Sequence, residues 1–67
     1  MNIKIKDEYI KLCQALKLAG LIDTGADAKF VILEGKVKVN GQVELQRGKK
    51  LRPGDTFEYE GKTVTVE

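Results

Sequence analysis

The spacing of hydrophobic positions changes along the chain and predicts a strand, then helices, then more strands. Ile3 and Ile5 alternate with polar residues, as in a short half-buried strand. From about Asp7 the spacing is that of one helical face, with Asp7 and Glu8 at the amino end, where the helix dipole favours anions. The apolar stripe of this first helix consists of Tyr9, Leu12, Cys13, Leu16, Ala19 and Gly20. Gly20 is expected to end the helix.

A second helix is predicted to begin after Thr24, because Thr24-Gly25-Ala26-Asp27 has the form of a capping box. Its core stripe, with helical spacing, consists of Ala28, Val31, Ile32 and Gly35. Gly35 is expected to end the helix in the left-handed conformation. The short connection at residues 21–23 predicts that the two helices pack as a pair. Phe30 and Leu33 lie outside the stripe, so we expect them to reach the sheet or to stay partly exposed.

From Lys36 onward the hydrophobic period is two, which indicates strands joined by tight turns. Asn40-Gly41 is a strong hairpin signal, and Val43 and Leu45 are expected to continue on the return strand. A polar, basic loop at residues 46–50 precedes Leu51, which is expected to be an anchor in the core.

The last segment predicts a turn and one more hairpin. Pro53-Gly54-Asp55 is expected to turn the chain. Phe57 and Tyr59 then alternate on one strand, and the return strand follows Gly61. The predicted fold is therefore a single α+β domain over residues 1–67. It has a short N-terminal strand, two packed helices and then a small antiparallel sheet of hairpins.

Composition excludes several kinds of chemistry. The chain has 67 residues, one Cys and no His, so Cys/His zinc sites and Ser–His–Asp or Cys–His catalysis have no candidates. Cys13 lies on the helical stripe and is expected to be an inert buried thiol. We expect no catalytic residue, no metal and no cofactor. No apolar run approaches the roughly 20 residues that span a bilayer, so we expect a reduced cytoplasmic protein without a membrane partner.

The net charge of +2 is unevenly distributed along the chain. Residues 29–52 carry seven basic side chains against two acidic ones, whereas residues 53–67 carry one against four. If the fold gathers the basic section on one face, that face attracts polyanions. The alternative is an ordinary solvated surface, and spacing alone does not separate the two. Lys29 is expected near the amino end of the second helix, where free backbone N–H groups also favour phosphate.

Many of these positions together resemble the S-four RNA-binding domain, which is named after a ribosomal protein of the small subunit. The resemblance runs without gaps from Lys11 to Asp55. Its most specific part is the second helix followed by Gly35-Lys36-Val37-Lys38-Val39-Asn40-Gly41. The short ends and the run Arg47-Gly48-Lys49-Lys50-Leu51-Arg52-Pro53-Gly54-Asp55 are similar to stand-alone, single-domain bacterial members of the family.

The resemblance implies a fold like the alpha-L RNA-binding motif, which binds structured RNA through its two helices and the adjoining loop. Lys11 occupies the position of the basic residue that opens the first helix, and Cys13 replaces the usual Asp. Thr24-Gly25 replaces a Ser-Arg pair, so the hydroxyl is kept and the arginine is lost. Lys29 replaces an arginine and lacks its planar fork. The candidate RNA-binding residues are Lys11, Thr24, Gly25, Lys29, Lys36, Lys38, Asn40, Arg47, Lys49, Lys50 and Arg52.

Two functions follow as hypotheses. The first is a non-enzymatic, monomeric module that binds ribosomal or transfer RNA, or the ribosome, and acts in ribosome assembly or translation. The second is a protein–protein adaptor whose basic face meets an acidic partner, with the RNA-binding surface eroded at Gly25. Partners that survive ribonuclease digestion in a pull-down would favour the adaptor.

Overall fold

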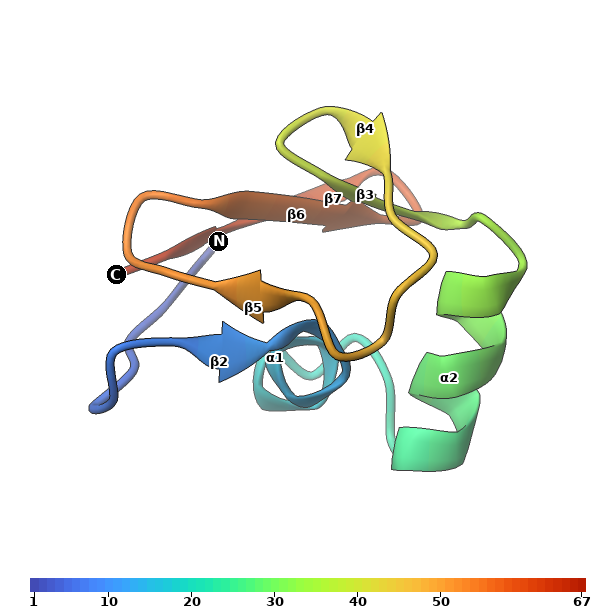
Figure 1. The fold of residues 1–67 in the computed structure, drawn as a ribbon, viewed down its shortest axis with the longest axis horizontal. Helices are drawn as coiled ribbons and strands as arrows, with labels where there is room; N and C mark the ends of the chain where they lie inside the picture. Colours follow the sequence, from blue (N-terminus) through green and yellow to red (C-terminus); the bar gives the residue numbers. More distant parts are fainter.

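The computed structural model describes all of residues 1–67 and contains two helices and seven short strands. Figure 1 shows their arrangement in space. In chain order the elements are β1 (Asn2–Ile3), β2 (Ile10–Lys11), α1 (Leu12–Leu18), α2 (Gly25–Leu33), β3 (Val37–Val39), β4 (Gln42–Val43), β5 (Lys50–Leu51), β6 (Thr56–Tyr59) and β7 (Lys62–Val66). The α+β fold class is thereby confirmed.

The larger sheet has five strands in the order β1-β7-β6-β3-β4. The β3–β4, β3–β6 and β6–β7 pairs are antiparallel, as the hairpin signals predict. The N-terminal strand β1 joins this sheet by pairing parallel to β7, with Asn2 opposite Thr65, so the sheet is mixed, a pairing that the sequence did not predict. Turn signals reveal only pairs that are local in sequence, and this pair joins the two ends of the chain.

A second sheet consists of the two strands β2 and β5. Because β2 occupies residues that were predicted to be helical, the first helix starts later than predicted. Ile10 lies opposite Leu51 in this antiparallel pair. The helix therefore begins at Leu12, and its first turn contains no acidic residue. Asp7 and Glu8 lie before β2, so they do not occupy the helix start that their charge suggests. The backbone around Ile10 forms hydrogen bonds with β5 instead of with a helical turn.

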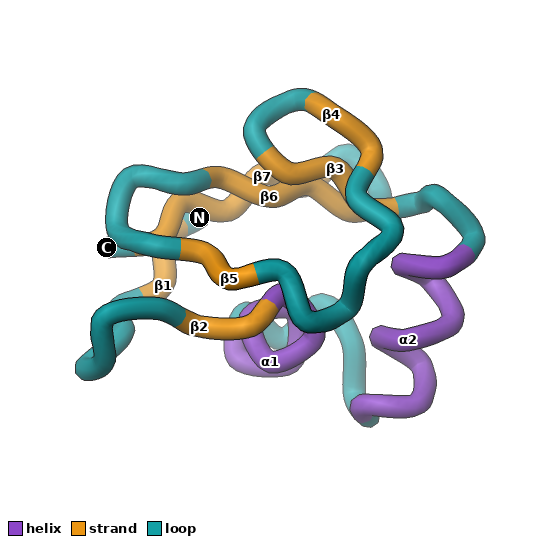
Figure 2. Tube along the Cα trace, viewed as in Figure 1, coloured by secondary structure: helices purple, strands orange, loops and turns teal.

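The core lies between the five-stranded sheet and the helices. Figure 2 shows both helices and the β2–β5 pair on the same side of that sheet. The buried side chains that fill this space are Ile3, Leu12, Ala15, Leu16, Ala28, Ile32, Val37, Val39, Leu51, Phe57, Val64 and Val66. No polar or charged residue is buried, so the core is held by apolar packing alone.

Several local predictions are confirmed. The hydroxyl of Thr24 accepts a hydrogen bond of 3.1 Å from the backbone N–H of Asp27 and caps α2. Gly35 follows that helix with φ of 75°, the left-handed conformation expected of it. Asn40 and Gly41 both have positive φ, 50° and 86°, as the two central residues of a type I′ hairpin require.

Other predicted positions differ from the structure. Cys13 is half-buried, so its thiol is not enclosed in the core. The return strand β4 ends at Val43, and both Val43 and Leu45 are exposed. By contrast, Phe30 and Leu33 agree with one of the two expected outcomes: both are exposed, because the buried face of α2 is the one that carries Ala28 and Ile32.

Candidate nucleic-acid interface

The basic loop before β5 is fixed on the start of α1 by backbone hydrogen bonds. Lys11 is the residue that caps this helix, and its side chain makes no capping bond. Instead, the carbonyl oxygen of Lys49 accepts from the N–H of Leu12 at 2.9 Å, and that of Arg47 accepts from Cys13 at 3.1 Å. The loop thus satisfies helix N–H groups that have no partner within the helix. Its basic side chains are held beside the helix start as a result.

Lys11 and Lys50 lie directly opposite each other in the β2–β5 pair. Both are exposed, and neither forms an ion pair. Like charges facing each other across strands are destabilising, and no carboxylate of the protein offsets this repulsion. Arg47 and Lys49 lie in the loop whose carbonyl groups bond the start of α1, and we name these four basic residues the loop surface. Lys49 also lines a hollow with residues of the β3–β4 hairpin, among them Val39 and Glu44. An anion placed at the loop surface would relieve the repulsion.

Tyr9 also belongs to this region, although its spacing predicts a place on the core stripe of a helix. It precedes β2, is half-buried, and its ring centroid lies 4.9 Å from the ammonium of Lys50. This distance is within the range of a cation–π interaction. In the sequence, the feature that could have indicated Tyr9 as a site residue is its position two residues before Lys11. Its partner Lys50 is distant along the chain, so the contact itself could not be predicted.

The start of α2 presents a second, weaker group of candidates. The Thr24 oxygen accepts the capping bond, which leaves the hydroxyl hydrogen free to donate. A Cβ added at Gly25 would meet no atom within 4 Å, so the missing arginine leaves open space. Lys29 is exposed but is the fifth residue of α2, one turn beyond the free N–H groups near which it was expected. Asp27 adds negative charge at this helix start.

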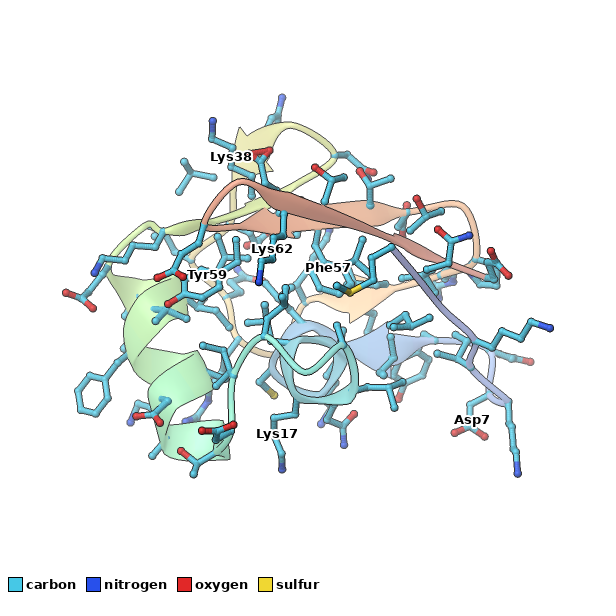
Figure 3. The ribbon with its side chains drawn as sticks, turned by 180° about the vertical axis from the view of Figure 1, so that it is seen from behind. Asp7, Lys17, Lys38, Phe57, Tyr59 and Lys62 are labelled. Carbon is cyan, nitrogen blue, oxygen red and sulfur yellow. The ribbon has the colours of Figure 1, made fainter.

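Lys38 is not gathered with the loop surface, and Lys36 has a partner within the protein. Lys36 forms a 3.9 Å ion pair with Glu34 at the end of α2, the only ion pair in the protein. Lys38 lies between the buried Val37 and Val39 on β3, so its side chain points to the face of the sheet that is opposite the core. Figure 3 shows Lys38 pointing away from the helices. The expectation that both lysines extend one surface with the basic loop therefore does not hold for Lys38.

Asn40 is occupied within the protein. Its side-chain oxygen accepts from the backbone N–H of Thr56 at 3.0 Å, and its amide nitrogen donates to Asp55 at 3.2 Å. The other oxygen of Asp55 accepts from the backbone N–H of Arg52 at 2.8 Å, while the Arg52 side chain stays exposed. Asn40 is therefore placed to hold the hairpin, and Arg52 is the member of this group with a free cation.

No group of three His, Cys, Asp or Glu side chains is arranged to hold a metal ion. Neither helix has the length and apolar character needed to cross a membrane.

Comparison with known families identifies the class of protein. The profile of the S4 domain family matches residues 3–67, and the chain therefore belongs to that family. The resemblance seen from Lys11 to Asp55 is confirmed and extends over nearly the whole chain.

Two bacterial relatives match over most of their length. YbcJ of Escherichia coli (strain K12) is 43% identical over 61 residues, which are 91% of this chain and 87% of the relative. RlbA of Bacillus subtilis (strain 168), named as a probable ribosome maturation protein, is 46% identical over 59 residues, 88% of this chain and 83% of the relative.

Solved structures share the fold. The solution structure of Escherichia coli YbcJ, described as having an ALFAL motif involved in RNA-binding, is 39% identical and gives a TM-score of 0.74. The match covers 97% of this chain and 84% of YbcJ. The 30S ribosomal protein S4e from Thermoplasma acidophilum gives a TM-score of 0.64 at 24% identity, over 87% of this chain and 31% of that one, and supports the fold alone.

Proposed function

We propose that the chain is a non-enzymatic RNA-binding module, one S4 domain over residues 1–67, that docks on structured RNA through the loop surface. The observation that carries this proposal is the attachment of the basic loop to the start of α1, which brings Lys11, Arg47, Lys49 and Lys50 together. None of these four cations has a carboxylate partner in the protein. RNA phosphates would neutralise them and release counterions, which favours binding.

The two named relatives support RNA binding and a role connected with the ribosome, and we propose ribosomal or transfer RNA as the ligand. YbcJ is associated with RNA-binding and RlbA with ribosome maturation. We propose that this chain acts likewise in ribosome assembly or translation, as a monomer in the cytoplasm. Contacts to phosphates would orient it on a folded RNA without reading base sequence directly.

The other candidates take secondary places in this proposal. The hydroxyl of Thr24 and the ammonium of Lys29 would add contacts along α2, and Arg52 would extend the loop surface past β5. Lys38 faces elsewhere and would contribute only long-range attraction, and the charge of Lys36 is partly offset by Glu34. We leave Asn40 out of the contact surface, because both polar atoms of its side chain are already bonded.

The test is binding of the purified protein to ribosomal RNA, transfer RNA and duplex DNA across a salt series. We expect one structured RNA to be preferred, with log affinity falling linearly against log salt by about 0.7–0.9 per phosphate neutralised. Equal and feeble binding to all three would contradict the proposal and favour the adaptor for an acidic protein partner.

Charge reversal locates the surface. The variant Arg47→Glu/Lys49→Glu/Lys50→Glu should lose most of its RNA affinity and keep its fold, because these side chains are exposed. Lys49→Glu and Lys62→Glu form a matched single pair with the same change of net charge. Lys62 lies at the start of β7, on the side seen in Figure 3, whereas β5 lies toward the viewer in Figure 1. Equal losses in this pair would remove the loop from the site.

A further inference from the structure

A groove of about 560 Å³ lies beside the loop surface, between the segment leading to β2 and one face of α1. The segment contributes residues 4–7, Tyr9 and Ile10. The helix contributes Gln14, Lys17 and Leu18, which are three and four positions apart and therefore share a face. Nothing in the proposed phosphate contacts uses this hollow.

The walls of the groove are apolar and accessible. Leu18 is 55% exposed and offers an aliphatic surface at the groove. Tyr9, Ile5 and Ile10 are half-buried around it, so part of each remains available to a ligand. Gln14 is exposed, and its side-chain amide makes no hydrogen bond within the protein. The amide can both donate and accept.

The rim of the groove is cationic. Lys4, Lys6 and Lys17 line it against a single carboxylate, that of Asp7, and none of these four forms an ion pair. Figure 3 shows Lys17 and Asp7 on the side of the molecule that faces away from the five-stranded sheet. The charges at the groove therefore sum to about two positive, in addition to those of the loop surface.

An apolar wall with an aromatic ring, a free amide and a cationic rim matches the chemistry of a single nucleotide. Aromatic and aliphatic side chains provide a surface for stacking a base, an amide can bond the base edge, and ammonium groups hold phosphates. The groove is also continuous with the loop surface. The Tyr9 ring lies 4.9 Å from the Lys50 ammonium, and Gln14 is one helical turn after Lys11.

We infer that this groove holds one unpaired nucleotide of the bound RNA, with the base against Tyr9 and Leu18, the amide of Gln14 on the base edge, and Lys6 and Lys17 on the flanking phosphates. This inference rests on the proposed function and adds the preferred form of its RNA. The loop surface needs the phosphates of an RNA backbone, and the groove needs one unpaired base. An RNA bulge, or an unpaired nucleotide at a junction next to an RNA helix, supplies both. The backbone of the RNA helix would occupy the loop surface while the unpaired base enters the groove.

Two hairpin RNAs that differ only by one bulged nucleotide test this inference. The protein should bind the bulged hairpin roughly 5- to 100-fold more tightly, the range expected from stacking one base. A third hairpin with an abasic bulge should bind like the unbulged one. Equal affinity for all three would overturn the inference and leave the proposed phosphate contacts standing.

Variants separate the groove from the loop surface. Gln14→Ala and Leu18→Ser alter exposed side chains, so the fold should persist, and each should reduce the preference for the bulge with little change for the plain hairpin. Tyr9→Ala should do the same if it folds, and Tyr9→Phe should keep the preference. The loop variant Arg47→Glu/Lys49→Glu/Lys50→Glu should instead weaken both hairpins equally. Retention of the full preference in Gln14→Ala and Leu18→Ser would place the base elsewhere.

A further experiment tests the groove without relying on RNA binding by the loop surface. Nucleoside monophosphates and inorganic phosphate, titrated separately and followed by NMR, should differ in effect. The nucleotides should shift the resonances of Tyr9, Gln14 and Leu18, and phosphate alone should not. Identical shifts with both would overturn the assignment of a base to the groove, even if RNA binding itself is established.

Discussion

The side-chain amide of Asn40 donates a hydrogen bond of 3.2 Å to the carboxylate of Asp55. This contact joins the turn of the β3–β4 hairpin to the turn that leads into β6. The backbone N–H of Asn40 reinforces the junction with a 2.9 Å bond to the carbonyl of Thr56. Two motifs that resemble the family separately, Val39-Asn40-Gly41 and Pro53-Gly54-Asp55, are therefore one structural unit.

Replacing Asn40 with Ala should lower the free energy of unfolding by about 1–3 kcal/mol, because partners of its side chain lose their bonds. The positive φ of 50° at this position adds a penalty for Ala. Urea denaturation measures the change, and Asn40→Gly separates the two causes, since Gly accepts this φ without making the bonds. Gln42→Ala, an exposed neighbour, is the control and should be nearly neutral. Equal stability of Asn40→Ala and Gln42→Ala would contradict a structural role for Asn40.

Gly25→Arg should strengthen RNA binding by restoring a basic side chain at the start of α2, where a Cβ meets no atom within 4 Å. The charge adds about one phosphate contact and should steepen the salt dependence by about 0.7–0.9 in log–log slope. Gly25→Gln is the matched control, because it supplies a long side chain and better helix propensity without the charge. Filter binding at two or more salt concentrations measures both. An equal gain in the two variants would assign the effect to helix stability.

Leu51→Ala should destabilise the protein by about 2–5 kcal/mol, the range for removing a fully buried leucine. Leu51 is 0% exposed and anchors β5, whereas Leu45 is 54% exposed just before the basic loop. Leu45→Ala is therefore a control with the same chemical change and should shift the urea midpoint little. Similar midpoints for both variants would show that β5 is not anchored in the core.

The pKa of Tyr59 is raised above 10.0 by partial burial of its ring, then by the neighbouring Glu60 carboxylate and by Glu34 and Asp27. The folded state therefore holds the phenolic proton more tightly than the unfolded state does. The resulting stabilisation is fully present below pH 10 and is lost as pH rises through the folded pKa. Ultraviolet titration of Tyr9→Phe, which leaves Tyr59 as the only tyrosine, should give a midpoint above that of free tyrosine. A midpoint at or below the free value would contradict this environment.

Most of the fold could be predicted from local patterns. The cap at Thr24, the end of α2 at Gly35 and the Asn40-Gly41 hairpin each depend on a few consecutive residues whose backbone angles or side-chain bonds are dictated locally. The first helix was predicted to start too early because Tyr9 has the right spacing for a helix. Its backbone lies next to β2, which pairs with β5 instead.

The candidate site was predictable in part. The charge count pointed to the basic loop, and the family resemblance pointed to Lys11. Neither observation predicts that the Lys38 side chain points to the face of the sheet opposite the core, or that the Asn40 side chain forms hydrogen bonds within the protein. Those outcomes depend on which strands become neighbours, and composition carries no such information.

The sequence by itself determined the types of element, their turns and caps, and the excess of basic residues between positions 29 and 52. These features rest on hydrophobic period, backbone preference and charge, which each residue contributes with its near neighbours. Only the tertiary structure decided that Lys11 faces Lys50 and that the carbonyl groups of Arg47 and Lys49 cap α1. Such contacts join residues distant in the chain. They form because packing Leu12 and Leu51 into one core brings the N–H groups of the helix start within reach of the loop.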